Sequence, residues 1–388
     1  MKRLRTIIKW TFISLIALHL LIVISGRTYL YKAVANTYLQ GRSSPDIYEY
    51  KIFDNAEVKS GVSQEWPMGK DYNSKNISSV LSEKINYYGT AAFLVIKNDS
   101  IRYEQYWDGN NEKSISNSFS MAKTIVSILI GIAIDDGKIR NVDQPVSDFL
   151  PEFKNGGREV VTIKHLLTMS SGINFDEDYV NPLAYPAAAY YGDDLKKLTY
   201  NYTVSKKPGN AFEYLSGNTE ILGFVLEKAT GFSISDYASE KLWKPLGATN
   251  PAYWSLDHSG GVEKAYCCFN SNARNFARFG QLYLRKGNWK GLQLVSSLYV
   301  MESVQPANVM DEHGKKNEKY GYSWWLVNYK QHPVFYARGI LGQYIFVIPD
   351  KDMVVVRLGH RRDKELVNGH PDDAFYYLDA ALEMYPDK

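Results

Sequence analysis

Cysteine is scarce in this sequence: a chain of 388 residues contains two, Cys267 and Cys268, and they are adjacent. Neighbouring cysteines have poor geometry for an ordinary structural disulfide and give no pattern of paired crosslinks. We therefore expect a fold that is not built on disulfides, with both thiols buried and inert, and a redox role for the pair is the alternative. The seven histidines include no His-x-x-x-His pair, and two neighbouring thiols cannot supply four zinc ligands. The sequence therefore predicts no metal and no other cofactor.

An excess of charge of one sign is also lacking. Forty-five Lys and Arg residues face 42 Asp and Glu residues, which leaves a formal net charge of +3. The basic residues are scattered rather than gathered into one stripe, so we do not expect a nucleic-acid partner. Four of them, Lys2, Arg3, Arg5 and Lys9, lie at the N-terminus, and the rest of the chain is close to neutral.

One long apolar run follows that basic cluster, at residues 10–25 (WTFISLIALHLLIVIS). This charge layout is typical of a signal peptide or a signal anchor, and both export the remainder of the chain. No clear small-x-small cleavage site follows Ser25, so we expect a retained anchor in the cytoplasmic membrane. The body would then lie on its periplasmic or extracellular side. The run is slightly short for about 30 Å of hydrocarbon and contains His19, which leaves a removed signal or a buried soluble helix as alternatives.

The remaining sequence is expected to divide into two parts after an N-terminal segment at residues 1–26. Residues 27–75 are irregular and polar, which suits a stalk or linker leading from the membrane. Residues 76–388 are expected to form the catalytic body, because the first strand-like runs begin there. An apolar share of 45% allows a body of this size to bury a large core.

Secondary structure is strongly patterned within that body. Two β-prone runs flank Asn98-Asp99 and predict a hairpin. A helix is predicted to start at Ser120 and to end near Gly137, because its apolar residues cover nearly every face. Further helices are expected at 163–169, 218–229, 234–242, 273–284 and 372–384, and antiparallel strands at 320–328, 334–339, 343–349 and 353–360. This order predicts an α+β fold, with one antiparallel sheet built from both chain ends, flanked by helices, and a mostly helical lobe inserted.

A Ser-x-x-Lys motif lies at the start of the predicted buried helix, at Ser120 and Lys123. A step of three residues brings the amine beside the hydroxyl. Serine is a weak nucleophile until a neighbouring base takes its proton, and apolar surroundings allow a lysine to be that base. The helix N-terminus also favours the oxyanion that forms when a carbonyl is attacked. The motif is expected about once by chance in a chain of this length, so an incidental match stays open.

A second group of polar residues precedes another predicted helix. Tyr214 and Ser216 lie two apart in an extended segment, so they can point the same way. A tyrosine in this place could exchange the proton of the nucleophile or of a leaving group. The alternative is a core tyrosine beside a helix N-cap, which the 30 tyrosines of the chain make common.

A third group is Ala337-Arg338-Gly339-Ile340, at the end of a late strand. Its glycine lets another backbone or a substrate approach closely, and the strand edge can donate an N–H group. A plain β-turn between strands is the alternative when this segment is considered alone.

Together these motifs resemble the penicillin-recognising serine hydrolase superfamily, which includes class C β-lactamases, D-alanyl-D-alanine carboxypeptidases and related esterases and amide hydrolases. The family pattern is a Ser-x-x-Lys, a Tyr-x-Asn or Tyr-x-Ser about a hundred residues later, and a Lys/His/Trp-x-Gly strand near the C-terminus. Here these are Ser120 and Lys123, Tyr214 and Ser216, and Ala337 and Gly339. The likeness covers residues 85–385 and is nearest to the branch with 6-aminohexanoate-dimer hydrolase and esterase-like proteins.

The resemblance implies roles for the site residues. Ser120 is expected to be acylated, Lys123 and Tyr214 to move its proton, and Ser216 and Gly339 to line the substrate site. The backbone N–H groups of Ser120 and Ile340 would bind the oxyanion. The expected function is hydrolysis of a small linear amide or ester, with no nucleic-acid partner and with the membrane contacted through the N-terminal segment.

One departure from the family pattern bears on the substrate. In β-lactamases the first residue of the third motif is a cation that holds a substrate carboxylate, whereas this chain has Ala337, and Arg338 should face the other side of the strand. Efficient β-lactam hydrolysis is therefore not expected. A cell-wall carboxypeptidase and a catalytically silent membrane module remain as alternatives. An α/β-hydrolase is excluded, because the sequence has no Gly-x-Ser-x-Gly.

Overall fold

A computed structural model describes residues 1–386, and its centre is a six-stranded antiparallel sheet. The strands lie in the order β3-β2-β12-β11-β10-β9, so strands from the start of the body pair with strands from its end. Their bounds are β2 Thr90–Lys97, β3 Ser100–Tyr106, β9 Trp325–Tyr329, β10 His332–Gly339, β11 Gln343–Ile348 and β12 Met353–Gly359. The prediction of a sheet built from both chain ends is confirmed.

The hairpin between β2 and β3 turns at Asn98 and Asp99, as the sequence predicts. Both residues have a positive φ, 51° and 57°. Two left-handed residues in a two-residue loop match the twist of the flanking strands, and Asn and Asp tolerate this conformation better than most residues.

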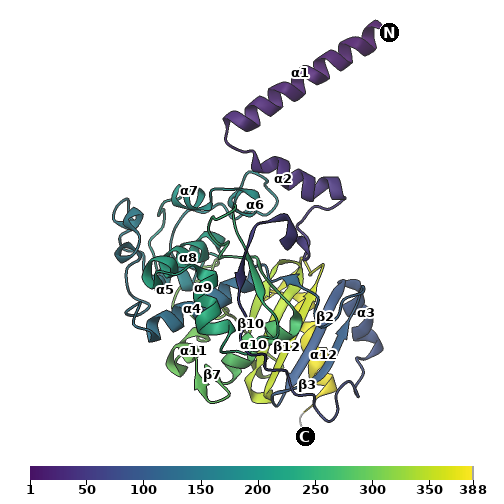
Figure 1. The fold of residues 1–388 in the computed structure, drawn as a ribbon, viewed down its shortest axis with the longest axis vertical. Coiled ribbons are helices and arrows are strands. Elements are labelled where there is room, and N and C mark those ends of the chain that lie inside the picture. The colour runs from purple at the N-terminus through teal and green to yellow at the C-terminus, as the bar shows by residue number, and fades with distance from the viewer. Residues whose placement is uncertain (387–388) are drawn as a thin grey trace.

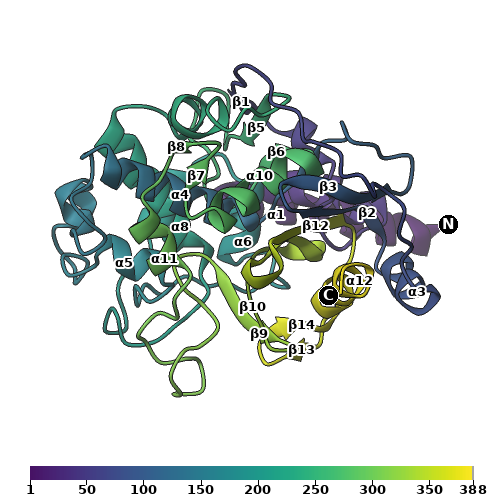
Figure 2. The ribbon, with the colours of Figure 1, turned by 90° about the horizontal axis from the view of Figure 1, so that it is seen from below.

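Helices cover both faces of this sheet (Figures 1 and 2). α3 (Ser79–Tyr87) and α12 (Asp372–Met384) lie on one face, while α4 (Met121–Asp135) and α10 (Ala273–Leu284) lie on the other. The apolar helix predicted from Ser120 is α4, in which every residue from Met121 to Ala133 is buried. Helical propensity alone does not explain such burial, and the helix is stabilised by packing on all sides. The predicted α+β architecture is confirmed.

The inserted lobe is mostly helical, as predicted. Its helices are α5 Ile163–Leu167, α6 Tyr185–Tyr191, α7 Leu195–Tyr200, α8 Ser216–Thr230 and α9 Ile234–Ala238, and α11 (Ser297–Ser303) follows after α10. α8 packs against α4 and α5, so the lobe rests on the same central helix as the sheet. Ser120 therefore lies where the two halves of the body meet.

A second, smaller sheet was not predicted. Its order is β1-β5-β6-β4, with bounds β1 Asn55–Val58, β4 Ser116–Asn117, β5 Ala252–Ser255 and β6 Phe269–Ser271. The strands have two to four residues, too few to show an alternating pattern. β1 brings part of the segment expected to be a stalk into the body, because it pairs with β5. Two short hairpins complete the strands, β7 Asn288–Trp289 with β8 Leu292–Gln293 and β13 Leu366–Val367 with β14 His370–Pro371.

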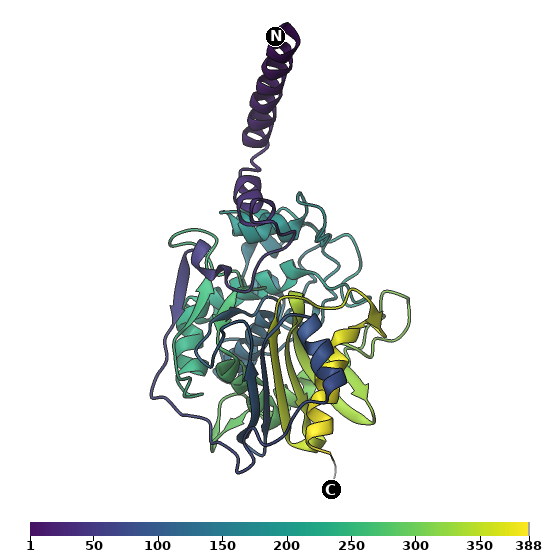
Figure 3. The same ribbon diagram turned by 90° about the vertical axis from the view of Figure 1, so that its right-hand side faces the viewer.

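The N-terminal segment forms a helix that projects away from the body, α1 (Lys2–Ile24), followed by the shorter α2 (Tyr29–Asn36) (Figures 1 and 3). α1 has a mean hydropathy of 2.3 over its most apolar window and no buried residue. By length and composition it could cross a membrane, and a signal sequence would pass the same test. α2 packs on α6, and the Tyr29 hydroxyl donates to the Pro182 carbonyl.

Candidate active site

Ser120 occupies the N-terminus of α4, three residues after the end of the short strand β4. The preceding residue, Phe119, has a φ of 44°, a left-handed conformation that is unfavourable by about 1–2 kcal/mol for a residue with a side chain. The side-chain oxygen of Asn117 stabilises this turn by accepting the Phe119 N–H at 2.8 Å. Ser120 retains 9% exposure, so its hydroxyl lies at the end of a buried helix but still reaches the surface.

Lys123 lies one helical turn after Ser120 and is 1% exposed. Its Nζ donates to the Oγ of Ser120 at 2.9 Å and to the backbone carbonyl of Tyr266 at 3.0 Å. The same amine lies over two aromatic rings, 5.1 Å from the centroid of Tyr214 and 5.5 Å from that of Tyr266. The structure thus brings together Ser120, Lys123 and the ring of Tyr214.

Tyr214 precedes α8 and is half-buried. Its ring packs against Trp325 and Tyr320, with centroid separations of 5.3 and 5.9 Å. Within residues 1–386 its hydroxyl makes no hydrogen bond to Ser120 or Lys123.

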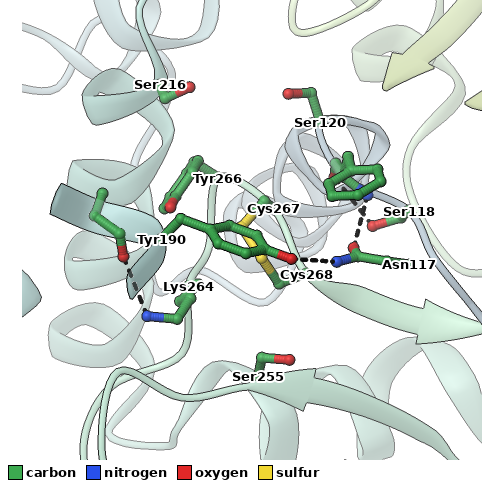
Figure 4. The surroundings of a disulfide bond; sticks show 12 residues. Asn117, Ser118, Ser120, Tyr190, Ser216, Ser255, Lys264, Tyr266, Cys267 and Cys268 are labelled. Carbon is green, nitrogen blue, oxygen red and sulfur yellow. Dashed lines mark hydrogen bonds between the residues drawn. A yellow bond between two sulfur atoms is a disulfide. The ribbon is translucent and has the colours of Figure 1, made fainter. Parts of the chain in front are cut away.

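Ser216 is held by a residue that the sequence did not single out. Glu177 accepts the Ser216 backbone N–H at 2.7 Å and also the Ser216 hydroxyl. A carboxylate at the N-terminus of α8 is well placed to satisfy a free N–H group of the first turn. In Figure 4 the hydroxyls of Ser216 and Ser120 point toward one another from the two helices. Ser216 makes no hydrogen bond with Ser120 or Lys123 in the described part of the chain.

Gly339 ends β10 against the backbone that leads to Ser120. A Cβ at this position would lie 2.4 Å from the Ser118 carbonyl oxygen, so only glycine allows this approach. Ile340 follows at the start of a short 3-10 turn. The Ser120 N–H has no backbone acceptor among residues 1–386. The β10 end and the start of α4 are therefore adjacent, which is the arrangement that a pair of oxyanion donors requires.

The two residues before Gly339 face opposite sides of the sheet. Ala337 is fully buried in the core shared with α4. The Arg338 guanidinium lies 3.3 Å from the centroid of the Trp325 ring and donates to the Gly369 carbonyl at 3.1 Å. Arg338, the cation within the third motif, is thus already engaged by an aromatic ring and a backbone carbonyl.

The segment before β6 carries the acceptor of Lys123 and a buried lysine, and it is contacted by a buried glutamate of α8. Lys264 is fully buried and donates to the Ala189 carbonyl, and burial lowers its pKa to about 8. Glu220 of α8 accepts the Ala265 N–H at 2.8 Å, and burial raises its pKa well above the usual range. These contacts fix the backbone of this segment beside α8. Burial also raises the pKa of Tyr266, so its phenol stays neutral.

The expectation of two free thiols is wrong. Cys267 and Cys268 are joined by a disulfide directly after Tyr266 (Figure 4). Their side chains are 3% and 0% exposed, so the expected burial is confirmed. Adjacent cysteines can be bridged only where the local backbone turns appropriately, and such a turn is not visible in the sequence.

Sequence reasoning missed Tyr266 and Glu177. Tyr266 contributes its backbone carbonyl, which any residue type carries, and Glu177 is one acid among several in an irregular segment. No sequence signal identifies either residue.

Among residues 1–386, no cluster of three or more His, Cys, Asp or Glu side chains is arranged to hold a metal. A cavity of about 300 Å³ beside Trp66, Asp99 and Trp289 is lined by none of the candidate site residues.

The family described as Beta-lactamase matches residues 81–375. The 6-aminohexanoate-dimer hydrolase of Paenarthrobacter ureafaciens is 27% identical over 321 residues, which cover 78% of this chain and 81% of that protein.

Solved structures show the same fold at low sequence identity. The structure called "Putative 6-aminohexanoate-dimer hydrolase from Bacillus anthracis" has a TM-score of 0.74 and 23% identity, covering 88% of this chain and 94% of its own. An octameric penicillin-binding protein homologue from Pyrococcus abyssi has a TM-score of 0.62 and 20% identity, covering 79% and 76%.

Proposed function

The chain belongs to the Beta-lactamase family of serine hydrolases, and on that premise we propose that it cleaves a linear amide or ester through an acyl-enzyme on Ser120. One observation carries the proposal. The amine of the buried Lys123 contacts the hydroxyl of Ser120 at 2.9 Å, at the N-terminus of a helix. The nucleophile and its base thus lie in contact at the positive end of the α4 helix dipole.

In the first step, Ser120 Oγ attacks the substrate carbonyl carbon and its proton passes to the pair formed by Lys123 and Tyr214. The C–O bond forms as the carbonyl becomes an oxyanion. The N–H groups of Ser120 and Ile340 bind that oxyanion, and each such donor contributes about 3–4 kcal/mol of transition-state stabilisation. The Tyr214 ring beside the amine excludes water and thereby strengthens these interactions.

In the second step, the pair returns the proton to the leaving amine or alcohol and the acyl group stays on Ser120. A water molecule then attacks the acyl carbon, again with the pair as base, and releases the acid and the free serine. Lys123 and Tyr214 act as one unit, because the Lys123 amine lies 5.1 Å from the centroid of the Tyr214 ring. Ser216, held by Glu177, lines the substrate site opposite Ser120.

The substrate class follows from the charges near the third motif. Recognition of a β-lactam carboxylate needs a free cation, and Arg338 is engaged by Trp325 and the Gly369 carbonyl. A neutral or amine-bearing linear substrate fits this site better. The relative from Paenarthrobacter ureafaciens is named 6-aminohexanoate-dimer hydrolase, and this name supports an amide as the bond that is cleaved.

The proposed organisation places the catalytic body outside the cytoplasm. α1 anchors the chain in the membrane, with the basic residues 2–9 on the cytoplasmic side. Residues 27–75 connect it to the catalytic domain at 76–388, and β1, which lies within this connection, pairs with β5 of the body.

Time-resolved intact mass spectrometry of the full chain tests this function. Short-chain esters and linear ω-amino amides are mixed with the protein, quenched at intervals and analysed for a mass increase equal to the acyl group. We expect a transient adduct on Ser120 that disappears as product accumulates. Turnover without any Ser120 adduct, or an adduct on another residue, would contradict the mechanism.

A further inference from the structure

The chain's two cysteines are bonded to each other directly after the residue whose carbonyl accepts the amine of the proposed catalytic lysine. Cys267 and Cys268 are the only cysteines in the sequence, and the bond lies directly after Tyr266, whose carbonyl accepts the Lys123 amine at 3.0 Å (Figure 4). Both side chains are buried. The bond is therefore part of the surroundings of Lys123 rather than a surface crosslink.

The disulfide segment also contacts the backbone that leads to Ser120. The Ser118 N–H donates to the carbonyl of Phe269, one residue after the disulfide, at 2.9 Å. The segment thus contacts the site at two points, through the Tyr266 carbonyl on Lys123 and through the Phe269 carbonyl on Ser118. A change in the backbone between these two carbonyls would move both.

The conformation that the bond restrains is unfavourable for a free chain. Cys268 has a φ of 68°, which is unfavourable by about 1–2 kcal/mol for a residue with a Cβ. The Cys268 carbonyl accepts the Ser255 N–H at 3.0 Å, and the Cys267 carbonyl accepts the indole N–H of Trp254 at 3.0 Å. The disulfide and these hydrogen bonds together hold residues 266–269 in place.

From these contacts we infer that the Cys267–Cys268 disulfide is a positioning element for Lys123, and that its reduction lowers the rate at which Ser120 is acylated. The inference rests on the proposed function, because it concerns the same nucleophile. Without the bond, Cys268 is free to leave the left-handed region. The Tyr266 carbonyl then moves relative to the Lys123 amine, and a misplacement of about 1 Å in such a site lowers rates on the order of a hundredfold.

The redox step is a dithiol–disulfide exchange. A thiolate of an external dithiol attacks one cysteine sulfur, the S–S bond breaks, and the other cysteine sulfur leaves as a thiolate that takes a proton. The second thiol of the reductant then attacks the mixed disulfide, closes its own disulfide and releases the second cysteine thiol. Two electrons pass from the dithiol to the cysteine pair. Because both sulfurs are buried, the segment at 264–269 must open for the attack.

This arrangement links activity to the redox state of the compartment. Disulfides persist in oxidising environments outside the cytoplasm and are reduced within it. A chain still in the cytoplasm carries two thiols and acylates slowly. After export the bond forms and the full rate is reached.

The test measures fluorophosphonate labelling of the full chain in detergent, with and without dithiothreitol. Free thiols are counted by maleimide mass shifts after a denaturing quench, and this count is unambiguous because the chain has no other cysteine. We expect labelling at least about tenfold slower in the fraction that carries two maleimides, and recovery after reoxidation. Equal labelling of both fractions, or two free thiols in protein secreted into an oxidising compartment, would overturn the inference.

A matched pair of variants tests whether the left-handed backbone at Cys268 is the cause. The pair can be used even where the buried disulfide resists reduction. Cys267→Ala/Cys268→Ala leaves a Cβ at the left-handed position, whereas Cys267→Ala/Cys268→Gly removes it. We expect the first variant to lose at least about tenfold in kcat with KM changed less than about twofold, and the second to regain most of that loss. Two variants with equal rates would overturn the inference, and thermal unfolding is measured to show that both are folded.

Ser120→Ala separates this inference from the proposed function. The proposed function fails if the Ser120→Ala protein still takes up the fluorophosphonate. The redox inference fails alone if labelling depends on Ser120 but not on the disulfide.

Discussion

The amine of Lys123 donates a hydrogen bond to the hydroxyl of Ser120 across 2.9 Å, in a position where the lysine is almost fully buried. The contact depends on helix geometry, because residues three apart lie on the same face. It also depends on the Tyr266 carbonyl, which holds the amine from the far side at 3.0 Å.

Replacing this lysine should remove the proton acceptor. We expect Lys123→Ala to lower kcat/KM for every hydrolysed ester and amide by about 10²–10⁴-fold, the usual contribution of a positioned base. Steady-state kinetics check this, and Lys138→Ala, an exposed lysine just beyond the same helix, is the control. Near wild-type turnover of Lys123→Ala on all substrates would disprove the proton-transfer scheme.

The hydroxyl of Tyr214 can be removed without its ring. Tyr214→Phe keeps the packing on Trp325 and Tyr320 and the contact with the Lys123 amine. We expect kcat to fall by about 10²–10³-fold while the thermal midpoint changes little. Tyr320→Phe removes a hydroxyl from the neighbouring ring and should leave kcat unchanged. An unchanged kcat in Tyr214→Phe would exclude this tyrosine from proton transfer.

Arg338 is engaged by Trp325 and the Gly369 carbonyl, and this should limit turnover of substrates that carry a carboxylate. We expect kcat/KM for the β-lactam nitrocefin to lie at least about a hundredfold below that for p-nitrophenyl acetate, the loss that one missing charge-assisted hydrogen bond produces. Both substrates are followed by absorbance with the same protein sample. Comparable values for the two would show that another group binds the carboxylate.

His370 should make the fold sensitive to acid. Burial lowers its pKa to about 3, and the positive charges of Arg338 and Lys319 add to the shift. Its Nδ1 lies 2.7 Å from the Tyr336 hydroxyl. Because the folded pKa lies below the unfolded value of about 6.5, the unfolded chain binds more protons below that pH. Stability is therefore complete above about pH 6.5 and is lost as the pH falls toward 3.

The replacement His370→Gln isolates this effect, since its amide oxygen can still accept from Tyr336. Urea unfolding of both proteins at about pH 7.5 and about pH 5 gives the comparison. We expect wild type to lose about 2 kcal/mol more than the variant over this interval. An equal loss in the two proteins would mean that His370 is protonated in the folded state.

The elements that could be predicted from the sequence are those whose pattern is local. The apolar run after Ser120 predicts α4, and Asn98-Asp99 between two β-prone runs predicts the first hairpin. The amphipathic segments at 273–284 and 372–384 match α10 and α12 at both ends. In each case hydrophobic periodicity and turn chemistry agree with the final packing.

The missed features depend on contacts between distant segments. Lys123 and Tyr266 are 143 positions apart, and Ser216 and Glu177 are 39 apart. Their interactions use a backbone carbonyl and one carboxylate in an irregular loop, for which no periodicity exists. The disulfide was missed because its formation depends on the backbone turn at Cys268, which tertiary contacts impose. The second sheet consists of strands too short to have a pattern of their own.

The central claim is that Ser120 is the nucleophile, and its most direct test is intact-mass labelling of the full chain with a fluorophosphonate, with ester turnover measured alongside. Ser118→Ala, a buried serine two positions earlier, is the matched control. The account predicts a single adduct on wild type and on Ser118→Ala, and no adduct and no turnover in Ser120→Ala. Unchanged labelling and turnover in Ser120→Ala would contradict it and place the nucleophile elsewhere.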